Sequence, residues 1–286
     1  MNAYADAAAF RQALEQRLNA RAADTGVEIN RLRRRVVFEC LLARFETTAP
    51  GEWVLKGGMA LELRLDERAR ATKDLDLALR DGDAEAPMRE RLVESLLVDP
   101  YGDRFEFQIA RVEALSADEA GRGGQRFSLL AGLAGREFTT VHLDVVERSD
   151  ELAGTERITL PGLLAFAGLP AVEIEVVDRA QHFAEKLHAL TRAYGDRENT
   201  RVKDLVDLVL LIEDGLAPDG RLRGNVEHVF AVRATHALPI EIVDPPADWA
   251  PVFVQLADSV GLRTPGLPAA LRVLRAFWAD TLAANG

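Results

Sequence analysis

Residues 55–61 read Leu-Lys-Gly-Gly-Met-Ala-Leu, and residues 70–76 read Arg-Ala-Thr-Lys-Asp-Leu-Asp. Around the first stretch, the short apolar run 53–55 predicts a strand, the two glycines predict a turn, and residues 59–65 predict a short helix. The second stretch leads into residues 74–79, whose alternation of polar and apolar side chains predicts another strand. The sequence therefore predicts a strand, a glycine turn and a helix, followed by a strand that contains two aspartates.

The two aspartates, Asp74 and Asp76, are expected to share one face of their strand with Thr72, because side chains two residues apart point the same way. Paired carboxylates are costly to leave without a cation, and Mg²⁺ prefers carboxylate and phosphate oxygens as ligands. Gly57 and Gly58 would let a phosphate approach the backbone at the start of a helix, where anions are favoured. An Asp-x-Asp pair alone is weak evidence, but the combination indicates a phosphate site beside a metal site.

A third carboxylate, Asp144, lies in the apolar run 141–146 and is expected to point away from Leu143 and Val145. An aspartate within an apolar strand is disfavoured and needs a partner. Two interpretations stay open, because structural ion pairs and functional sites both hold such groups. Asp144 is either a further ligand of the same metal ion or one half of an ion pair with a nearby arginine.

The rest of the chain supplies helices on both sides of this unit. Apolar side chains recur at helical spacing through residues 10–22 and 28–45, before Pro50 and Gly51 end the pattern. Farther along, the patterns predict a helix at 87–98, strands at 105–112, 126–130, 138–146 and 172–176, helices at 161–166 and 179–194, and mainly helix from 199 onward. We therefore expect an α+β protein with a mixed or antiparallel sheet. Its expected parts are N-terminal helices that pack on the core (1–50), an α/β domain (51–160) and a mainly helical domain (161–286).

Charge is spread unevenly along the chain. The 286 residues include 35 Lys and Arg against 46 Asp and Glu, a net charge of −11, which at first argues against a nucleic-acid partner. Residues 1–73, however, have 13 basic and 10 acidic side chains, and they include the arginine-rich run 31–35. Net charge therefore does not exclude nucleic acid. It predicts that any binding is confined to one face and weakens at high salt.

Other bulk features narrow the class of protein. The single cysteine, Cys40, excludes an intramolecular disulfide and is expected in the core. There is no credible Ser/Cys–His arrangement, and His182 and His188 are expected to be structural histidines. No apolar run reaches the roughly 20 residues that cross a bilayer, and the first residues lack a signal-peptide pattern. We expect a cytoplasmic protein without a membrane partner.

Two later stretches place charged side chains in apolar helices. Residues 184–190 hold Lys186 in mid-helix, where it could face the surface or bind a phosphate as a point charge. Residues 201–208 hold Asp204 and Asp207, which share one face of a helix because they are three residues apart. These two aspartates could equally pair with basic neighbours in the same helix.

The four stretches, in this order and at about these separations, resemble the motifs of the nucleotidyltransferase superfamily, and most closely those of its AbiEii/MenT-type toxin branch. The resemblance rests on residues 55–61, 70–76, 184–190 and 201–208, and it extends over about residues 50–215. It implies a nucleotidyltransferase-like α/β domain followed by a helical domain. Met59 departs from the pattern, because a threonine is commoner there in the family.

The resemblance also implies a reaction, in which an acceptor hydroxyl attacks the α-phosphate of a nucleoside triphosphate (NTP) and pyrophosphate leaves. Asp74 and Asp76, with Asp144 as a third ligand, would hold Mg²⁺ or Mn²⁺. The residues implied in catalysis are Asp74, Asp76, Lys186 and Asp204. Those implied in nucleotide binding are Gly57, Gly58, Thr72, Lys186 and Asp207.

The acceptor is implied less directly. MenT-type proteins resemble toxins that add pyrimidine nucleotides to the 3′ end of tRNA, so tRNA and a cognate antitoxin are the expected partners. The candidate RNA contacts are Arg31, Arg34, Arg35, Arg68 and Arg70, although a run of arginines is also typical of a solvated helix face. Two other functions stay open: transfer to a small molecule or a protein on the same fold, and nucleotide binding without catalysis. The presence of both Asp74 and Asp76 argues against the second.

Overall fold

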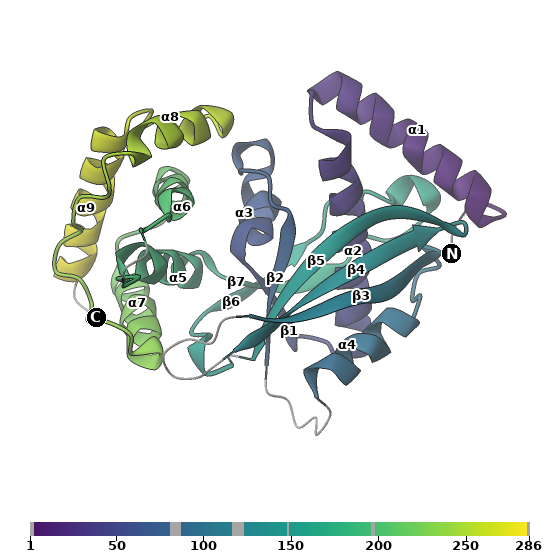
Figure 1. The fold of residues 1–286 in the computed structure, drawn as a ribbon, viewed down its shortest axis with the longest axis horizontal. Helices are drawn as coiled ribbons and strands as arrows, with labels where there is room; N and C mark the ends of the chain where they lie inside the picture. Colours follow the sequence, from purple (N-terminus) through teal and green to yellow (C-terminus); the bar gives the residue numbers. More distant parts are fainter. Residues whose placement is uncertain (1–2, 81–86, 116–122, 148, 196–197, 285–286) are drawn as a thin grey trace.

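The computed structural model describes residues 3–80, 87–115, 123–147, 149–195 and 198–284. Within these residues a seven-stranded mixed sheet lies at the centre of the molecule (Figure 1). Helices from the N-terminal half cover the sheet, while the helices of the C-terminal half gather beyond one end of it (Figure 1). This arrangement confirms the predicted α+β fold.

The strands of the sheet are β1 (Trp53–Lys56), β2 (Asp74–Leu79), β3 (Phe105–Leu115), β4 (Gly124–Leu133), β5 (Arg136–Glu147), β6 (Thr155–Thr159) and β7 (Glu173–Val177). Their order across the sheet is β3-β4-β5-β2-β1-β7-β6. Strand β1 runs antiparallel to β2 and parallel to β7, and β2 runs parallel to β5. The remaining neighbours are antiparallel. The two strands of the unit predicted around the glycines therefore form the middle of the sheet.

The helices divide between two hydrophobic cores. They are α1 (Ala7–Thr25), α2 (Ile29–Thr48), α3 (Gly57–Leu65), α4 (Met88–Leu97), α5 (Arg179–Thr191), α6 (Val202–Glu213), α7 (Gly220–Arg233), α8 (Trp249–Ser259) and α9 (Leu267–Ala283). Apolar residues of α1, α2 and the sheet form the first core, which includes Phe10, Leu41 and Leu77, and Cys40 is buried there as predicted. Among the described residues, no helix is long and apolar enough to cross a membrane.

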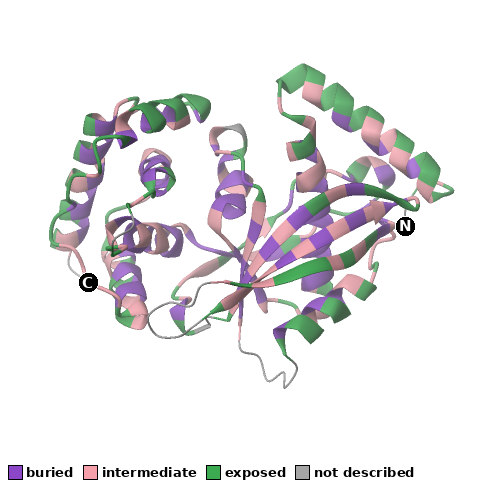
Figure 2. Cartoon of the chain, in the orientation of Figure 1, coloured by how far each residue is buried: buried purple, intermediate pink, exposed green. Residues whose placement is uncertain are grey.

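Helix α3 contributes to both cores. Met59 and Ala60 belong to the first core, whereas Leu61 and Leu65 pack in the second with α5 to α9. Figure 2 shows the corresponding band of buried residues along α3 and on the inner sides of the C-terminal helices. The short helix that follows the two glycines therefore joins the sheet to the helical part of the chain.

Some details differ from the sequence-based predictions. The predicted helix at 161–166 is wrong: a short 3₁₀ helix occupies Ala165–Ala167, and Gly162 has a φ of +70°, which an α-helix does not accept. Strand β6 was not predicted, because its sequence, Thr-Glu-Arg-Ile-Thr, has a single apolar side chain and so lacks the alternation typical of a strand. Strand β7 lies beyond residue 160, so the sheet continues past the boundary expected there. Helix α3 starts at Gly57, so the glycines form its first turn.

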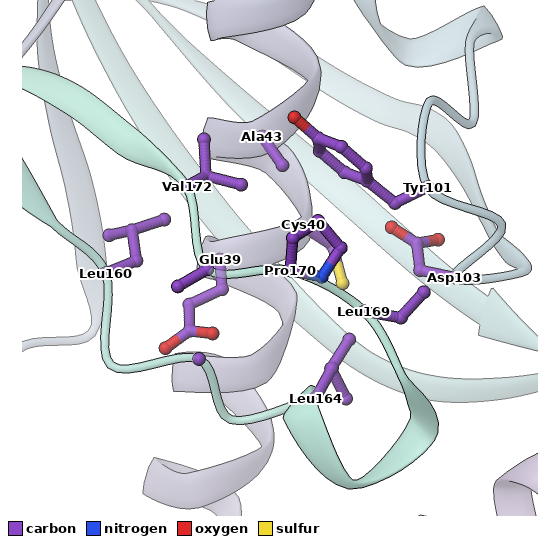
Figure 3. A pocket seen from close by; sticks show the side chains of 12 residues that line it. Glu39, Cys40, Ala43, Tyr101, Asp103, Leu160, Leu164, Leu169, Pro170 and Val172 are labelled. Atoms are coloured by element: carbon purple, nitrogen blue, oxygen red, sulfur yellow. The ribbon is translucent and has the colours of Figure 1, made fainter. Parts of the chain in front are cut away.

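A small pocket lies beside α2, where that helix faces the chain segment that leads to β7 (Figure 3). Its cavity volume is about 30 Å³, and its lining includes Glu39 and Cys40. Oε2 of Glu39 accepts a hydrogen bond from the backbone N–H of Leu163 at 2.9 Å, whereas Oε1 has no hydrogen-bond partner in the described parts of the chain. Glu39 is 8% exposed, and burial raises its pKa to about 7.

This shift in pKa predicts how stability depends on pH. The pKa of Glu39 in the folded chain lies above its ordinary value of 4.5, so the folded chain binds this proton more tightly than the unfolded chain does. The contribution of Glu39 to the free energy of unfolding is therefore favourable at low pH and is lost as the pH rises towards 7. Glu39→Gln cannot ionise and keeps an acceptor for Leu163. We expect the free energy of unfolding of the wild type to fall between pH 4 and pH 8 by about 1–3 kcal/mol more than that of Glu39→Gln.

Urea unfolding at both pH values measures this difference. Glu94→Gln is the matched control, because Glu94 is an exposed glutamate on α4. Equal pH dependence in the wild type and in Glu39→Gln would contradict the prediction.

Candidate active site

An open cleft lies between the centre of the sheet and the C-terminal helices α5 and α6, with a cavity volume of about 690 Å³. Most of the residues singled out in the sequence line it, although they come from parts of the chain more than 100 residues apart. The lining residues are Lys56, Gly57, Gly58, Arg70, Thr72, Asp74, Asp76, His182, Glu185, Lys186, Ala189, Thr200, Arg201, Lys203, Asp204 and Arg233. The cleft therefore brings together all four sequence stretches.

The aspartates of β2 form one side of this cleft. Asp74 and Asp76 are partly exposed there, while Leu75 and Leu77 are fully buried on the opposite face, as the alternation predicts. Thr72 is buried beside them and donates a hydrogen bond to the backbone oxygen of Asp74 at 3.1 Å. The strand thus holds both carboxylates towards the cleft.

The neighbouring strands place more charged groups around Asp76. In the sheet register Asp76 lies opposite Lys56 of β1 on one side and opposite Asp144 of β5 on the other. Burial, and next the charge of Asp144, raise the pKa of Asp76 to about 6, although Lys186 and Lys56 act in the opposite direction. The carboxyl group of Asp76 therefore stands where additional positive charge would be stabilising.

The two glycines are needed because the chain passes very close to β2. A Cβ atom on Gly57 would lie 2.0 Å from Oδ2 of Asp76, and the φ of Gly57 is +64°. A Cβ atom on Gly58 would lie 2.9 Å from Oγ1 of Thr72. Only glycine combines this backbone conformation with this close approach. The start of α3, where the first N–H groups of a helix have no partner within the helix, therefore lies directly beside Asp76.

Asp144 is held by an arginine that the sequence analysis did not single out. Arg126 of β4 lies opposite Asp144 in the sheet and donates from Nε to Oδ1 and from Nη2 to Oδ2, both at 2.6 Å. Its Nη2 also donates to Oδ2 of Asp74 at 3.3 Å. This contact corresponds to the ion-pair interpretation of Asp144, whereas its role as a metal ligand stays a prediction. In the sequence, the only available signal was a basic residue in the alternating run 126–130.

Across the cleft, Lys186 of α5 is the central cation. Its Nζ lies 2.7 Å from Oδ1 of Asp204 and 2.8 Å from Oδ2 of Asp207, both on α6. Burial acts to lower the pKa of Lys186, but Asp207 and Asp204 together raise it above its ordinary value, so Lys186 stays charged. The lysine lines the cleft and is fixed there by two carboxylates.

The two aspartates of α6 have different surroundings. Asp204 lines the cleft, whereas Asp207 is fully buried behind Lys186. Asp207 also accepts hydrogen bonds from Arg70, the closest from Nη2 at 2.8 Å. Arg70 lies four residues before the start of β2, the strand with the two aspartates. Asp207 therefore joins α5, α6 and the start of β2 through charged contacts.

A second cross-cleft contact, missed by sequence reasoning, joins Lys56 to Glu185. Nζ of Lys56 lies 2.8 Å from Oε2 of Glu185 on α5. Glu185 precedes Lys186 in the sequence, so β1 and α5 are linked one residue away from the central lysine. Such a pairing of residues 129 positions apart has no local sequence signal.

The two histidines of α5 differ from each other. His188 is structural, as predicted, since its Nε2 lies 2.9 Å from Oγ1 of Thr235 and its ring contacts Phe230. His182 lines the cleft, is 1% exposed, and has no hydrogen-bond partner at either ring nitrogen within the described residues. Burial lowers the pKa of His182 well below its ordinary value, so its ring is neutral.

The arginines predicted to contact RNA are engaged with carboxylates. Arg31 and Arg35 pair with Glu62 and Asp66 at the closest distances of 2.9 and 3.0 Å. Arg34 and Arg68 make longer contacts, at 3.7 Å, with Glu28 and Glu213. Of the five, Arg70 alone lines the cleft, where Arg201 and Lys203 provide further positive charge. The RNA-binding role of these arginines stays a prediction.

A family model described as "Nucleotidyl transferase AbiEii toxin, Type IV TA system" matches residues 40–274. No curated protein sequence matches the chain. The family match covers most of the chain and includes all four stretches that line the cleft.

The close approach at Gly57 generates a test. We expect Gly57→Ala to lower nucleotidyl transfer by about 100-fold or more, because its Cβ atom would displace Asp76. Gly135→Ala is the matched control, since Gly135 also has a positive φ, +67°, but its added Cβ atom meets no atom within 4 Å. The control isolates the cost of the backbone conformation, about 1–2 kcal/mol in stability. Equal activity in the two variants would contradict the role assigned to Gly57.

The buried position of Asp207 generates a second test. Asp207→Asn leaves Arg70 without its carboxylate and Lys186 with only one, so we expect a loss of about 3–5 kcal/mol in the free energy of unfolding. Asp204→Asn is expected to lose less, because Asp207 still neutralises Lys186. Urea unfolding of both variants measures the difference, and a larger loss in Asp204→Asn would overturn this assignment.

Proposed function

The chain belongs to the AbiEii family of nucleotidyl transferase toxins, and we propose that it transfers a nucleotide, preferably a pyrimidine nucleotide, from an NTP to the 3′ end of tRNA. The type IV toxin–antitoxin system of this family implies an antitoxin partner. The observation that carries the proposal is the placement of the carboxylates of β2 and the charged Lys186 in one cleft. Carboxylates near residue 75 and a lysine more than 100 residues later in the chain supply the two kinds of charge that phosphoryl transfer would use.

The nucleotide is proposed to bind with its phosphates between the start of α3 and α5. The free N–H groups at Gly57 and Gly58 favour an anion, and Lys186 offers a fixed positive charge. Asp204 holds Lys186 from the α6 side, so the ammonium group is already in place before a ligand arrives. Preorganised charge of this kind is more effective in catalysis than charge that must first be ordered.

The carboxylates of β2 are proposed to hold a divalent cation, Mg²⁺ or Mn²⁺. The donor set fits, because Asp74 and Asp76 are hard oxygen donors on one strand face and a cationic group, Arg126, already lies between Asp74 and Asp144. When bound, the cation supplies charge stabilisation at the reacting phosphate and its leaving group. Asp74, Asp76 and Asp144 would be the residues that hold it.

The acceptor end of tRNA is proposed to enter from the open side of the cleft. Arg201 and Lys203 line the cleft there, and within the described residues neither has carboxylate contacts as short as those of Lys186. Arg201 also lies over the ring of Tyr194, with its guanidinium 5.4 Å from the ring centroid. Exposed cations beside an aromatic ring are a surface suited to the phosphates and bases of a single-stranded RNA end.

Incubation of the full chain with Mg²⁺, total tRNA and each α-labelled NTP in turn tests the proposal. We expect the label to enter tRNA, most strongly from CTP or UTP. Label that enters only a small molecule or a protein would replace the proposed acceptor. Nucleotide binding without any incorporation would instead indicate a binding module.

Lys186→Met tests the site within the same assay. We expect it to lower transfer by about 100-fold or more, because the fixed cation is lost from the phosphate site. Lys73→Met is the matched control and should retain activity, since Lys73 is exposed and does not line the cleft. Full activity in Lys186→Met would overturn the assignment of this lysine.

A further inference from the structure

Arg126 lies between the carboxylates of Asp74 and Asp144, although it belongs to none of the sequence motifs. It lies on β4, and its side chain extends over β5 to β2, so that one guanidinium contacts Asp144 through two hydrogen bonds and Asp74 through a third. Parallel hydrogen bonds between an arginine and a carboxylate are among the stronger polar contacts in proteins. Arg126 therefore gathers two carboxylates that lie on neighbouring strands.

The same contact engages the carboxylate oxygens that another cation would need. The oxygens of Asp144 both face Arg126, and one oxygen of Asp74 does so as well. Accordingly, within the described residues no group of three Asp, Glu, His or Cys side chains is arranged to hold a metal ion. The carboxylate of Asp76 forms no hydrogen bond or ion pair with the parts of the chain that the structure describes. Arg126 is thus the cation that contacts Asp74 and Asp144 directly.

Arg126 is also partly exposed to solvent. Its side chain is 35% exposed, and that of Asp74 is exposed to the same extent. By comparison, Lys186 on the opposite side of the cleft is 12% exposed and is held between buried carboxylates. A long side chain at the edge of the cleft can leave its partners at a much smaller cost than a buried one.

We propose that Arg126 closes the carboxylate cluster in the resting protein and competes with the divalent cation for Asp74 and Asp144. Arg126 is then a positioning residue: it keeps the carboxylates gathered without a metal ion, and it lowers their affinity for one. The phosphate oxygens of an NTP in the cleft offer the guanidinium an alternative partner. This inference rests on the proposed function, because it assumes that the carboxylates of β2 bind a divalent cation.

Titration of the full chain with Mn²⁺ alone, followed by the electron paramagnetic resonance signal of free Mn²⁺, tests the proposal without catalysis. We expect Arg126→Gln to bind Mn²⁺ about tenfold or more tightly than the wild type, because the competing cation is removed. Arg126→Lys keeps a charge but loses the parallel hydrogen bonds, so its affinity should lie between the two. Without metal, Arg126→Gln should melt at a lower temperature than the wild type, and Mn²⁺ should reverse the loss.

Arg157→Gln is the matched control. Arg157 of β6 is an arginine of similar exposure, 44%, that pairs with Glu46 at 2.7 Å at the other end of the sheet order. We expect its affinity for Mn²⁺ to equal that of the wild type, which separates competition at the cluster from a change in net charge. Asp76→Asn in the Arg126→Gln background should remove the added affinity.

The possible failures are distinguishable. If Arg126→Gln binds Mn²⁺ no more tightly than the wild type while the wild type transfers nucleotides, the competition is overturned and the proposed function stands. If added affinity persists with Asp76→Asn, the ion binds elsewhere and the proposal is overturned. If the wild type and all variants lack both Mn²⁺ binding and metal-dependent transfer, the proposed metal-dependent function fails, and the inference fails with it.

Discussion

The arrangement of the cleft depends on one buried interaction, the contact of Asp207 with Lys186 and Arg70. Each of the three charged groups belongs to a different segment: the approach to β2, helix α5 and helix α6. A buried charge without a partner is strongly destabilising, so the three segments can be buried together only in a geometry that satisfies all of them. This constraint helps to set the position of Lys186 relative to the carboxylates of β2 on the other side of the cleft.

The central part of the fold could be predicted because its signals are local. Alternation in residues 74–79 places two aspartates on one strand face, and helical spacing through residues 10–22 and 28–45 predicts α1 and α2. Most of the other strands of the sheet were also predicted, because polar and apolar side chains alternate along them. By contrast, β6 has too few apolar side chains to be recognised, and the positive φ of Gly162 excludes an α-helix near the start of the segment 161–166, which the sequence pattern alone does not reveal.

The candidate site could be predicted in its residues but not in its contacts. Asp74, Asp76, Lys186 and Asp204 do line one cleft, and their motifs indicated them. Arg126 and Glu185 were missed, because a charged residue on a strand or helix looks the same whether it faces solvent or a partner far away in the sequence. The arginine run 31–35 illustrates the same limit, since Arg31 and Arg35 hold Glu62 and Asp66 rather than forming a solvated face.

Helix α3 carries a consequence for the way the protein unfolds. Its nine residues contribute Met59 and Ala60 to one hydrophobic core and Leu61 and Leu65 to the other. Loss of either core would expose apolar side chains of this helix and release the glycines that rest against β2. We therefore expect the sheet and the C-terminal helices to melt as one cooperative unit, because a fragment without α3 would lack part of its core.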